Sequence, residues 1–138
     1  MLDEATDFPR SIAVGEPKRT AQHALLEAYH SAQAEDWDRE GAARVEPTTY
    51  FFADQFLRLL PTTSLPNLEI AADRDGEILF EWDFGRRHVF SVSVGRDGTL
   101  SFAGLFGYAK IHGTEHLGEV LPLAVSNSLQ RLITSARA

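Results

Sequence analysis

The chain has 138 residues, of which 43% are hydrophobic and 24% charged, and it carries a formal net charge of −7. This size and composition are typical of one globular domain with a buried core. An acidic surface repels phosphate backbones, which disfavours direct nucleic-acid binding. The lack of cysteine excludes disulfides and thiolate metal sites. The N-terminus has no apolar segment, and no apolar run is long enough to cross a membrane, so we expect a cytoplasmic protein.

Two helices are expected in the first half of the chain. Residues 1–16 show no periodicity, so we expect a flexible lead-in followed by a single α+β domain over residues 17–138. Pro17 stands where proline is common at the start of a helix, and residues 17–36 repeat alanine and leucine at helical spacing. Residues 47–61 begin and end with proline and predict the second helix.

The second half of the chain predicts strands. Residues 68–108 contain four runs with period-two alternation, LEIAAD, EILFEWD, HVFSVSV and TLSFAGLFGY, separated by turn residues. These runs predict a four-stranded antiparallel β-meander, and residues 121–138 predict a third helix. The fold class is therefore α+β: two N-terminal helices, the meander and a C-terminal helix, with the helices packed on one face of the sheet.

The tripeptide Arg-Asp-Gly occurs at 74–76 and again at 96–98. It suits a three-residue hairpin loop that ends in a left-handed residue, a conformation that glycine adopts at little cost. We interpret both copies as turns, which pair Asp73 with Glu77 and Gly95 with Thr99. Continuing the register across FGRR pairs Ile78 with Val92 and Phe80 with Phe90.

This phasing sorts the strand residues onto two faces, because successive side chains of a strand alternate. One face collects the large apolar residues and predicts the floor of the core: Leu68, Ile70, Ala72, Ile78, Phe80, Trp82, Phe90, Val92, Val94, Leu100, Phe102 and Phe106.

The opposite face carries the candidate partner-binding residues. Leu79, Val89 and Leu105 form an apolar strip there between carboxylates and serines, and Arg86 and Arg87 occupy the tip of the middle hairpin. A solvated face and a contact face for a partner or a second copy of the chain both fit this pattern. The predicted partner-binding set is Glu69, Leu79, Glu81, Asp83, Arg86, Arg87, Val89 and Leu105.

The sequence HGTEH at 112–116 matches the inverted zincin signature, in which His112 and His116 would bind zinc and Glu115 would activate water. The motif requires a helix, and the glycine and threonine at its centre weaken helices. A catalytic zinc also needs a third protein ligand. We therefore expect a strand-to-helix connection here and no metal or other cofactor, with a zinc hydrolase as an alternative function.

The stretch from 47 to 104 resembles a pattern in small uncharacterised bacterial proteins, a helical half ending in LP and then P…DG-E-I…EW…SV…DG. The residues that carry it are Pro66, Asp75, Gly76, Glu77, Ile78, Glu81, Trp82, Ser91, Val92, Asp97 and Gly98. The resemblance implies a fold and identifies no catalytic residue.

The sequence thus favours a small, acidic, non-enzymatic protein that binds another protein. No nucleophile with a base and no phosphate-binding glycine loop is present. We expect an inhibitor of the phage anti-defence, antitoxin or immunity type, whose partner could be a basic nucleic-acid-binding protein. A secretion-chaperone-like homodimer is the alternative within this class.

Overall fold

The computed structural model describes residues 8–137, and its side chains are described for residues 16–135. The strands form one antiparallel sheet in the chain order β1-β2-β3-β4-β5. The elements are α1 (Phe8–Ser31), α2 (Pro47–Leu59), a 3-10 turn (Thr62–Ser64), β1 (Leu68–Ala72), β2 (Ile78–Asp83), β3 (His88–Val94), β4 (Thr99–Phe106), β5 (Ala109–His116) and α3 (Leu123–Arg137). The α+β class with its antiparallel sheet is therefore confirmed. No helix in the described part of the chain is long and apolar enough to cross a membrane.

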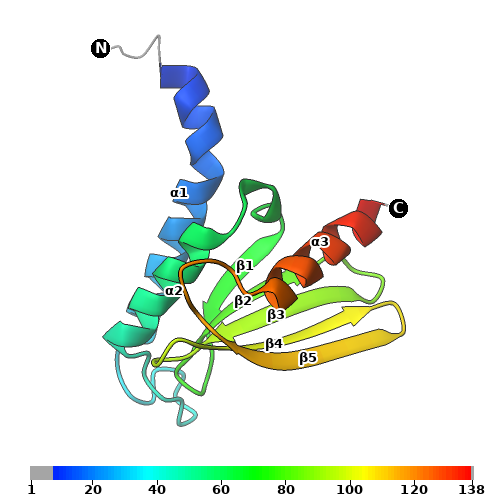
Figure 1. Cartoon of the computed structure of the whole chain (residues 1–138). Helices are drawn as coiled ribbons and strands as arrows, with labels where there is room; N and C mark the ends of the chain where they lie inside the picture. The colour runs from blue at the N-terminus through cyan, green and yellow to red at the C-terminus, as the bar shows by residue number, and fades with distance from the viewer. Residues whose placement is uncertain (1–7, 138) are drawn as a thin grey trace.

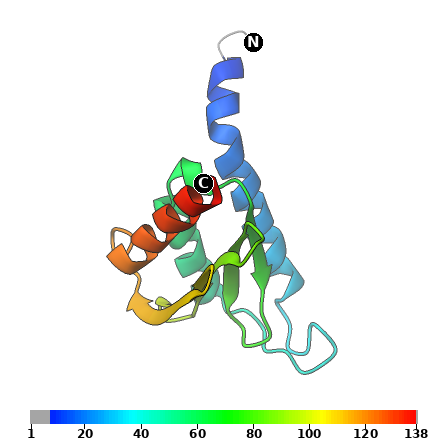
Figure 2. The same ribbon diagram turned by 90° about the vertical axis from the view of Figure 1, so that its right-hand side faces the viewer.

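The three helices lie on one side of the sheet (Figure 1). Helix α1 packs against β1 and α2, α2 touches β2 and β3, and α3 lies over β3 and β4. The turned view shows α1 and α3 above different halves of the sheet (Figure 2). The N-terminal part of α1 extends away from the sheet (Figure 1). This two-layer arrangement buries one sheet face beneath the helices.

The sheet has five strands and not the expected four, because residues 109–116 form β5 and pair with β4. The hairpin that joins them has a two-residue loop, Gly107 and Tyr108, and Gly107 adopts a left-handed φ of 66°. Glycine at the first loop position is typical of such tight hairpins. The expected connection between strand and helix is therefore shorter and begins only after His116.

Helix α1 begins nearer the N-terminus than expected. It starts at Phe8, so Pro17 lies inside the helix and not at its first turn. Of the expected lead-in, residues 1–7 lie outside the described residues and residues 8–16 belong to α1. Proline lacks a backbone N–H and is rare in helix interiors, which is why the sequence favoured a start at this residue.

Both Arg-Asp-Gly copies are hairpin turns, as predicted. Asp73 N donates to Glu77 O at 2.9 Å, and Gly95 N donates to Thr99 O at 3.0 Å. The glycines that end the two turns have φ of 84° and 83°. The predicted register of the β1–β2 and β3–β4 hairpins is confirmed in full.

The register of the middle hairpin differs from the prediction by two residues. Ile78 pairs with Val94 and Phe80 with Val92, whereas the sequence predicted Val92 and Phe90 as their partners. Three consecutive residues, 85–87, adopt positive φ in this loop, which is uncommon for the two arginines. A shift of two residues keeps each side chain on its face, so the predicted core face survives the error.

The core lies between this face and the helices. Trp82, Phe80 and Phe90 are fully buried, and Trp82 Nε1 donates to Ser64 O at 2.6 Å. Phe56 of α2 meets Phe80 edge to face, with ring centroids 4.9 Å apart. All twelve residues predicted for the core floor are buried or packed against the core. A substantial hydrophobic core thus forms on one side of the sheet only.

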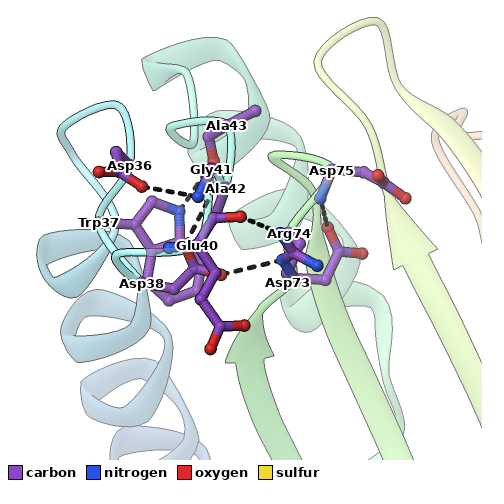
Figure 3. A network of polar contacts seen from close by, with 10 residues as sticks. All are labelled: Asp36, Trp37, Asp38, Glu40, Gly41, Ala42, Ala43, Asp73, Arg74 and Asp75. Atoms are coloured by element: carbon purple, nitrogen blue, oxygen red, sulfur yellow. Dashed lines mark hydrogen bonds and ion pairs between the residues drawn. The ribbon is translucent and has the colours of Figure 1, made fainter.

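Hydrogen bonds and an ion pair connect the segment between α1 and α2 to the β1–β2 hairpin (Figure 3). Arg74 donates from Nε to Asp38 Oδ2 at 2.9 Å and from Nη2 to the carbonyl oxygen of Glu40. Ala43 N donates to Arg74 O, and Trp37 Nε1 donates to Ala43 O at 2.8 Å. The backbone hydrogen bond from Glu40 is the main cause that lowers the pKa of Asp38. The tip of the β1–β2 hairpin is thereby held by a neighbouring loop.

Candidate functional site: the outer face of the sheet

The sheet face that points away from the helices is called the outer face here. The strand register arranges its side chains in three rows that cross the sheet from β1 or β2 to β5. The first row is Asp83–Val89–Leu105–Lys110, the second is Glu69–Glu81–Ser91–Ala103–His112, and the third is Ala71–Leu79–Ser93–Ser101–Thr114. The first two rows begin with carboxylates and end with a basic residue.

Charge is therefore divided across the outer face. The acidic side chains belong to β1 and β2, and the basic ones, Lys110 and His112, belong to β5. Glu69 and Glu81 are directly paired in the register, an arrangement in which like charges destabilise a sheet. Among the described residues, the ion pairs do not involve Asp83 or Lys110 or the two glutamates. Both charged sides of the face are thus available to an external group.

An apolar and slightly hollowed area lies in the first row of the outer face, at the end of the sheet next to the β2–β3 hairpin. Val89 and Leu105 pair directly with each other, and both are only half-buried. A shallow depression of about 450 Å³ covers β3, β4 and β5 at this place. Its lining is Val89, Ser91, Ala103, Gly104, Leu105, Lys110, Ile111 and His112.

The structure separates Leu79 from the other two residues of the predicted apolar strip. Leu79 pairs with Ser93 in the third row, whereas Val89 and Leu105 lie in the first row. The row that contains Glu81 lies between them, because the middle hairpin is shifted by two residues. The predicted continuous strip is therefore a Val89–Leu105 pair and a separate Leu79.

Arg86 and Arg87 occupy the tip of the β2–β3 hairpin as predicted. Arg87 is tied to the neighbouring hairpin, since its Nε donates to Gly107 O at 3.0 Å and its guanidinium lies 5.0 Å from the Tyr108 ring centroid. Tyr108 is the most exposed large hydrophobic side chain of the described residues, at 91%. Lys110 and His112 were absent from the predicted partner-binding set because β5 was not predicted, and Tyr108 was expected within the fourth strand.

The HGTEH motif does not form the helix that zincin chemistry requires. Its residues lie in β5, where His112 and His116 are four positions apart along an extended chain. The Cα atoms of His112 and His116 are therefore about 13 Å apart, which is too far for both side chains to bind one zinc ion. Glu115 also points to the opposite sheet face from the two histidines. The zinc hydrolase alternative therefore loses its structural basis at this motif.

An acidic cluster lies where the two Arg-Asp-Gly turns are side by side. Burial, followed by the nearby charges of Asp73, Asp75 and Asp97, raises the pKa of Glu77 there. Within the described residues, no group of three or more histidine, cysteine, aspartate or glutamate side chains has the geometry to hold a metal ion. The cluster is therefore a site of charge repulsion.

A second surface depression lies on the helix side, between α1 and the edge strand β1. It has a volume of about 490 Å³ and is largely apolar, with Ala21, Leu68 and Ile70 in its lining. Among the described residues, its lining contains one charged residue, Glu16, and no basic residue. The outer face differs from this depression in presenting both acidic and basic side chains beside apolar ones.

Comparison with known proteins adds no relative: no family model, no curated protein and no solved structure matches the chain.

Proposed function

We propose that this protein is a non-catalytic binding protein that docks another protein on the outer face of its sheet. The observation that carries the proposal is the one-sided cover of the sheet, whose one face packs against the helices (Figure 1). The other face presents the Val89–Leu105 pair between charges that have no ion-pair partner among the described residues. Apolar residues with polar and charged residues around them are the usual composition of a protein interface.

The acidic half of the outer face supports an inhibitor that binds a basic protein, such as one that handles nucleic acid. Glu69 and Glu81 repel each other in the free protein, and Asp83 follows Glu81 by two positions on the same face. A lysine or arginine of the partner placed between these carboxylates would relieve that repulsion and form charge-assisted hydrogen bonds. The carboxylates would then occupy the place of phosphates on the partner's nucleic-acid site.

Site-specific photocrosslinking in the source cell tests this function. A benzophenone amino acid at exposed Ala103 of β4 is expected to crosslink a partner protein, whereas the same amino acid at exposed Gln130 of α3 is not. The two positions lie on opposite sides of the molecule, so Gln130 controls for random encounters.

Binding of the identified partner then decides the mechanism. Reversing both paired carboxylates, Glu69→Lys with Glu81→Lys, is expected to weaken partner affinity at least about tenfold, because attraction becomes repulsion. Thermal unfolding of the variant checks that the fold is kept. A partner whose affinity does not respond to this variant binds elsewhere, and the proposed function then fails.

A further inference from the structure

We propose that the outer face is self-complementary and binds a second copy of the same chain, in a face-to-face dimer whose two-fold axis runs parallel to the strands between β3 and β4. This inference rests on the proposed function, because it assumes that the outer face is a docking surface, and it identifies one partner for that surface.

The symmetry follows from the order of charges across the sheet. A two-fold axis parallel to the strands, lying between two stacked sheets, places β3 over β4 of the second copy and β2 over β5 of the second copy. This axis does not change a residue's position along the strand direction. Each row therefore lies over the same row of the second copy, with its order across the sheet reversed. Opposite ends of the rows therefore meet.

The first row gains two kinds of contact in this arrangement. Asp83 lies over Lys110 of the second copy, and Val89 lies over Leu105 of the second copy. Each contact occurs twice because the interface is isologous. Stacked sheets lie about 10 Å apart and cross at about 30°. The Val89–Leu105 contacts lie beside the axis, so they are displaced least by this crossing angle.

The second row repeats the same logic. Glu81 lies over His112 of the second copy, and Ser91 lies over Ala103 of the second copy. A carboxylate thus meets a basic side chain, and two small residues meet where the sheets must approach. Glu69 lies outside the overlap of the four strands and keeps its exposure to solvent.

The alternative face-to-face symmetry is excluded by charge. A two-fold axis perpendicular to the strands would place β2 over β2 and β5 over β5. With this axis on the first row, Asp83 meets Asp83 and Lys110 meets Lys110 of the second copy. With the axis between the first and second rows, Asp83 meets Glu81 and Lys110 meets His112 of the second copy. Like charges facing each other across an interface weaken association strongly. The division of charge therefore selects one axis.

The footprint predicts a weak dimer. Four overlapping strands spaced by about 4.8 Å, each about 20 Å long, cover roughly 400 Å² of each sheet. Specific interfaces commonly bury about 800 Å² on each partner, so dissociation in the micromolar range is expected. A partner protein bound to the outer face would compete with the second copy, and self-association would then hold the protein in a reserve form.

Sedimentation velocity on the full chain between about 5 and 500 µM tests self-association, since weak interfaces dissociate at low concentration. The wild type is expected to shift from monomer to dimer over this range. Asp83→Lys alone and Lys110→Glu alone are each expected to raise the dissociation constant at least about tenfold, because each places like charges together twice in the dimer.

An equal mixture of the two variants gives the decisive result. In the mixed dimer the two substituted side chains face each other with opposite charge at one contact, and the native Asp83 and Lys110 face each other at the other. The mixture is therefore expected to dimerise while each variant alone does not. Within one chain, β2 and β5 lie about 14 Å apart, so this rescue cannot arise inside a monomer. Circular dichroism confirms that both variants are folded, which matters because Asp83 Oδ1 also accepts a hydrogen bond from Gly85 N at 2.8 Å.

A wild type that stays monomeric at 500 µM overturns the dimer, as does a dimer that neither variant weakens. A mixture that remains monomeric overturns the proposed axis. These results leave the proposed function standing as long as the crosslinker at Ala103 captures a different protein whose binding depends on Glu69 and Glu81. A crosslinked product that contains only two copies of this chain supports the dimer and contradicts the inhibitor function.

Discussion

At the scale of single residues, Thr49 stands out because its side chain is fully buried in α2 while its hydroxyl lacks a hydrogen-bond partner among the described residues. Thr49→Val removes this unsatisfied group at almost constant volume, so we expect the free energy of unfolding to rise by about 1 kcal/mol. Ser64→Ala is the matched control. Ser64 Oγ donates a hydrogen bond to Pro61 O at 2.7 Å, and the loss of this bond should lower the free energy of unfolding. Urea denaturation measures both variants, and a destabilised Thr49→Val would contradict the assignment.

Glu77 gives a prediction about pH at the same scale. Burial, with Asp73, Asp75 and Asp97 nearby, raises the pKa of Glu77, so its charged form opposes folding at neutral pH. The destabilisation by Glu77 therefore decreases as the pH falls through the raised pKa of the folded state toward the unfolded value of about 4.3. Glu77→Gln should raise stability at pH 7 by well under about 1 kcal/mol, because partial exposure screens the repulsion.

The gain from Glu77→Gln should shrink as the pH falls toward about 4, because the glutamate then becomes mostly protonated in both the folded and the unfolded state. Denaturation midpoints measured from pH 4 to pH 8 follow this dependence. Glu119→Gln serves as the control, since Glu119 is exposed in the loop before α3. An advantage for Glu77→Gln that stays constant with pH would show that charge is not its cause.

At the scale of elements, the two Arg-Asp-Gly turns are alike in sequence and different in surroundings. A Cβ added to Gly76 would lie 2.7 Å from the backbone oxygen of Arg44, whereas a Cβ added to Gly98 would lie 3.3 Å from the Phe52 ring. Alanine in the left-handed region costs about 1–2 kcal/mol at either position. We expect Gly76→Ala to cost clearly more than Gly98→Ala in thermal and urea unfolding, because a backbone carbonyl yields less than a ring. Equal losses would contradict the close packing of the first hairpin.

The elements also show where prediction from sequence succeeds. The β1–β2 and β3–β4 hairpins were predictable because a glycine fixes each turn and alternation fixes each face. The β2–β3 register was not, because Arg86 and Arg87 adopt left-handed backbones that sequence rules disfavour. Contacts from Arg87 to Gly107 and Tyr108 of the next hairpin support that loop. Strand β5 lacks an apolar alternation because it is an exposed edge, although its Gly107–Tyr108 turn was a signal for a hairpin.

At the scale of the whole molecule, the two faces of the sheet should respond differently to substitution. Trp82→Ala removes a fully buried side chain from the covered face and should cost about 3–5 kcal/mol. Leu79→Arg places a charge on the outer face and should change the free energy of unfolding by less than about 1 kcal/mol. Denaturation curves measure both, and unfolding of Leu79→Arg would mean that the outer face is covered in the native protein.

The candidate site was predictable only in part, again for reasons of tertiary structure. The six strand residues of the predicted partner-binding set do share the outer face, because alternation alone decides which face a side chain takes. Their neighbours could not be predicted, because the two-residue shift of β2 against β3 separates Leu79 from Val89. The basic edge with Lys110 and His112 also depends on β5, whose pairing with β4 no local pattern of apolar residues indicated.

By itself the sequence determined the turns at Gly76 and Gly98, the phase of the strands and hence the identity of the buried face, since these depend on backbone conformation and period-two alternation over a few residues. The tertiary structure decided the register across the middle hairpin, the existence of β5 and the start of α1. It also decided the separation of acidic and basic side chains across the outer face, because that order depends on which strands lie side by side, a relation between distant segments that no local pattern encodes.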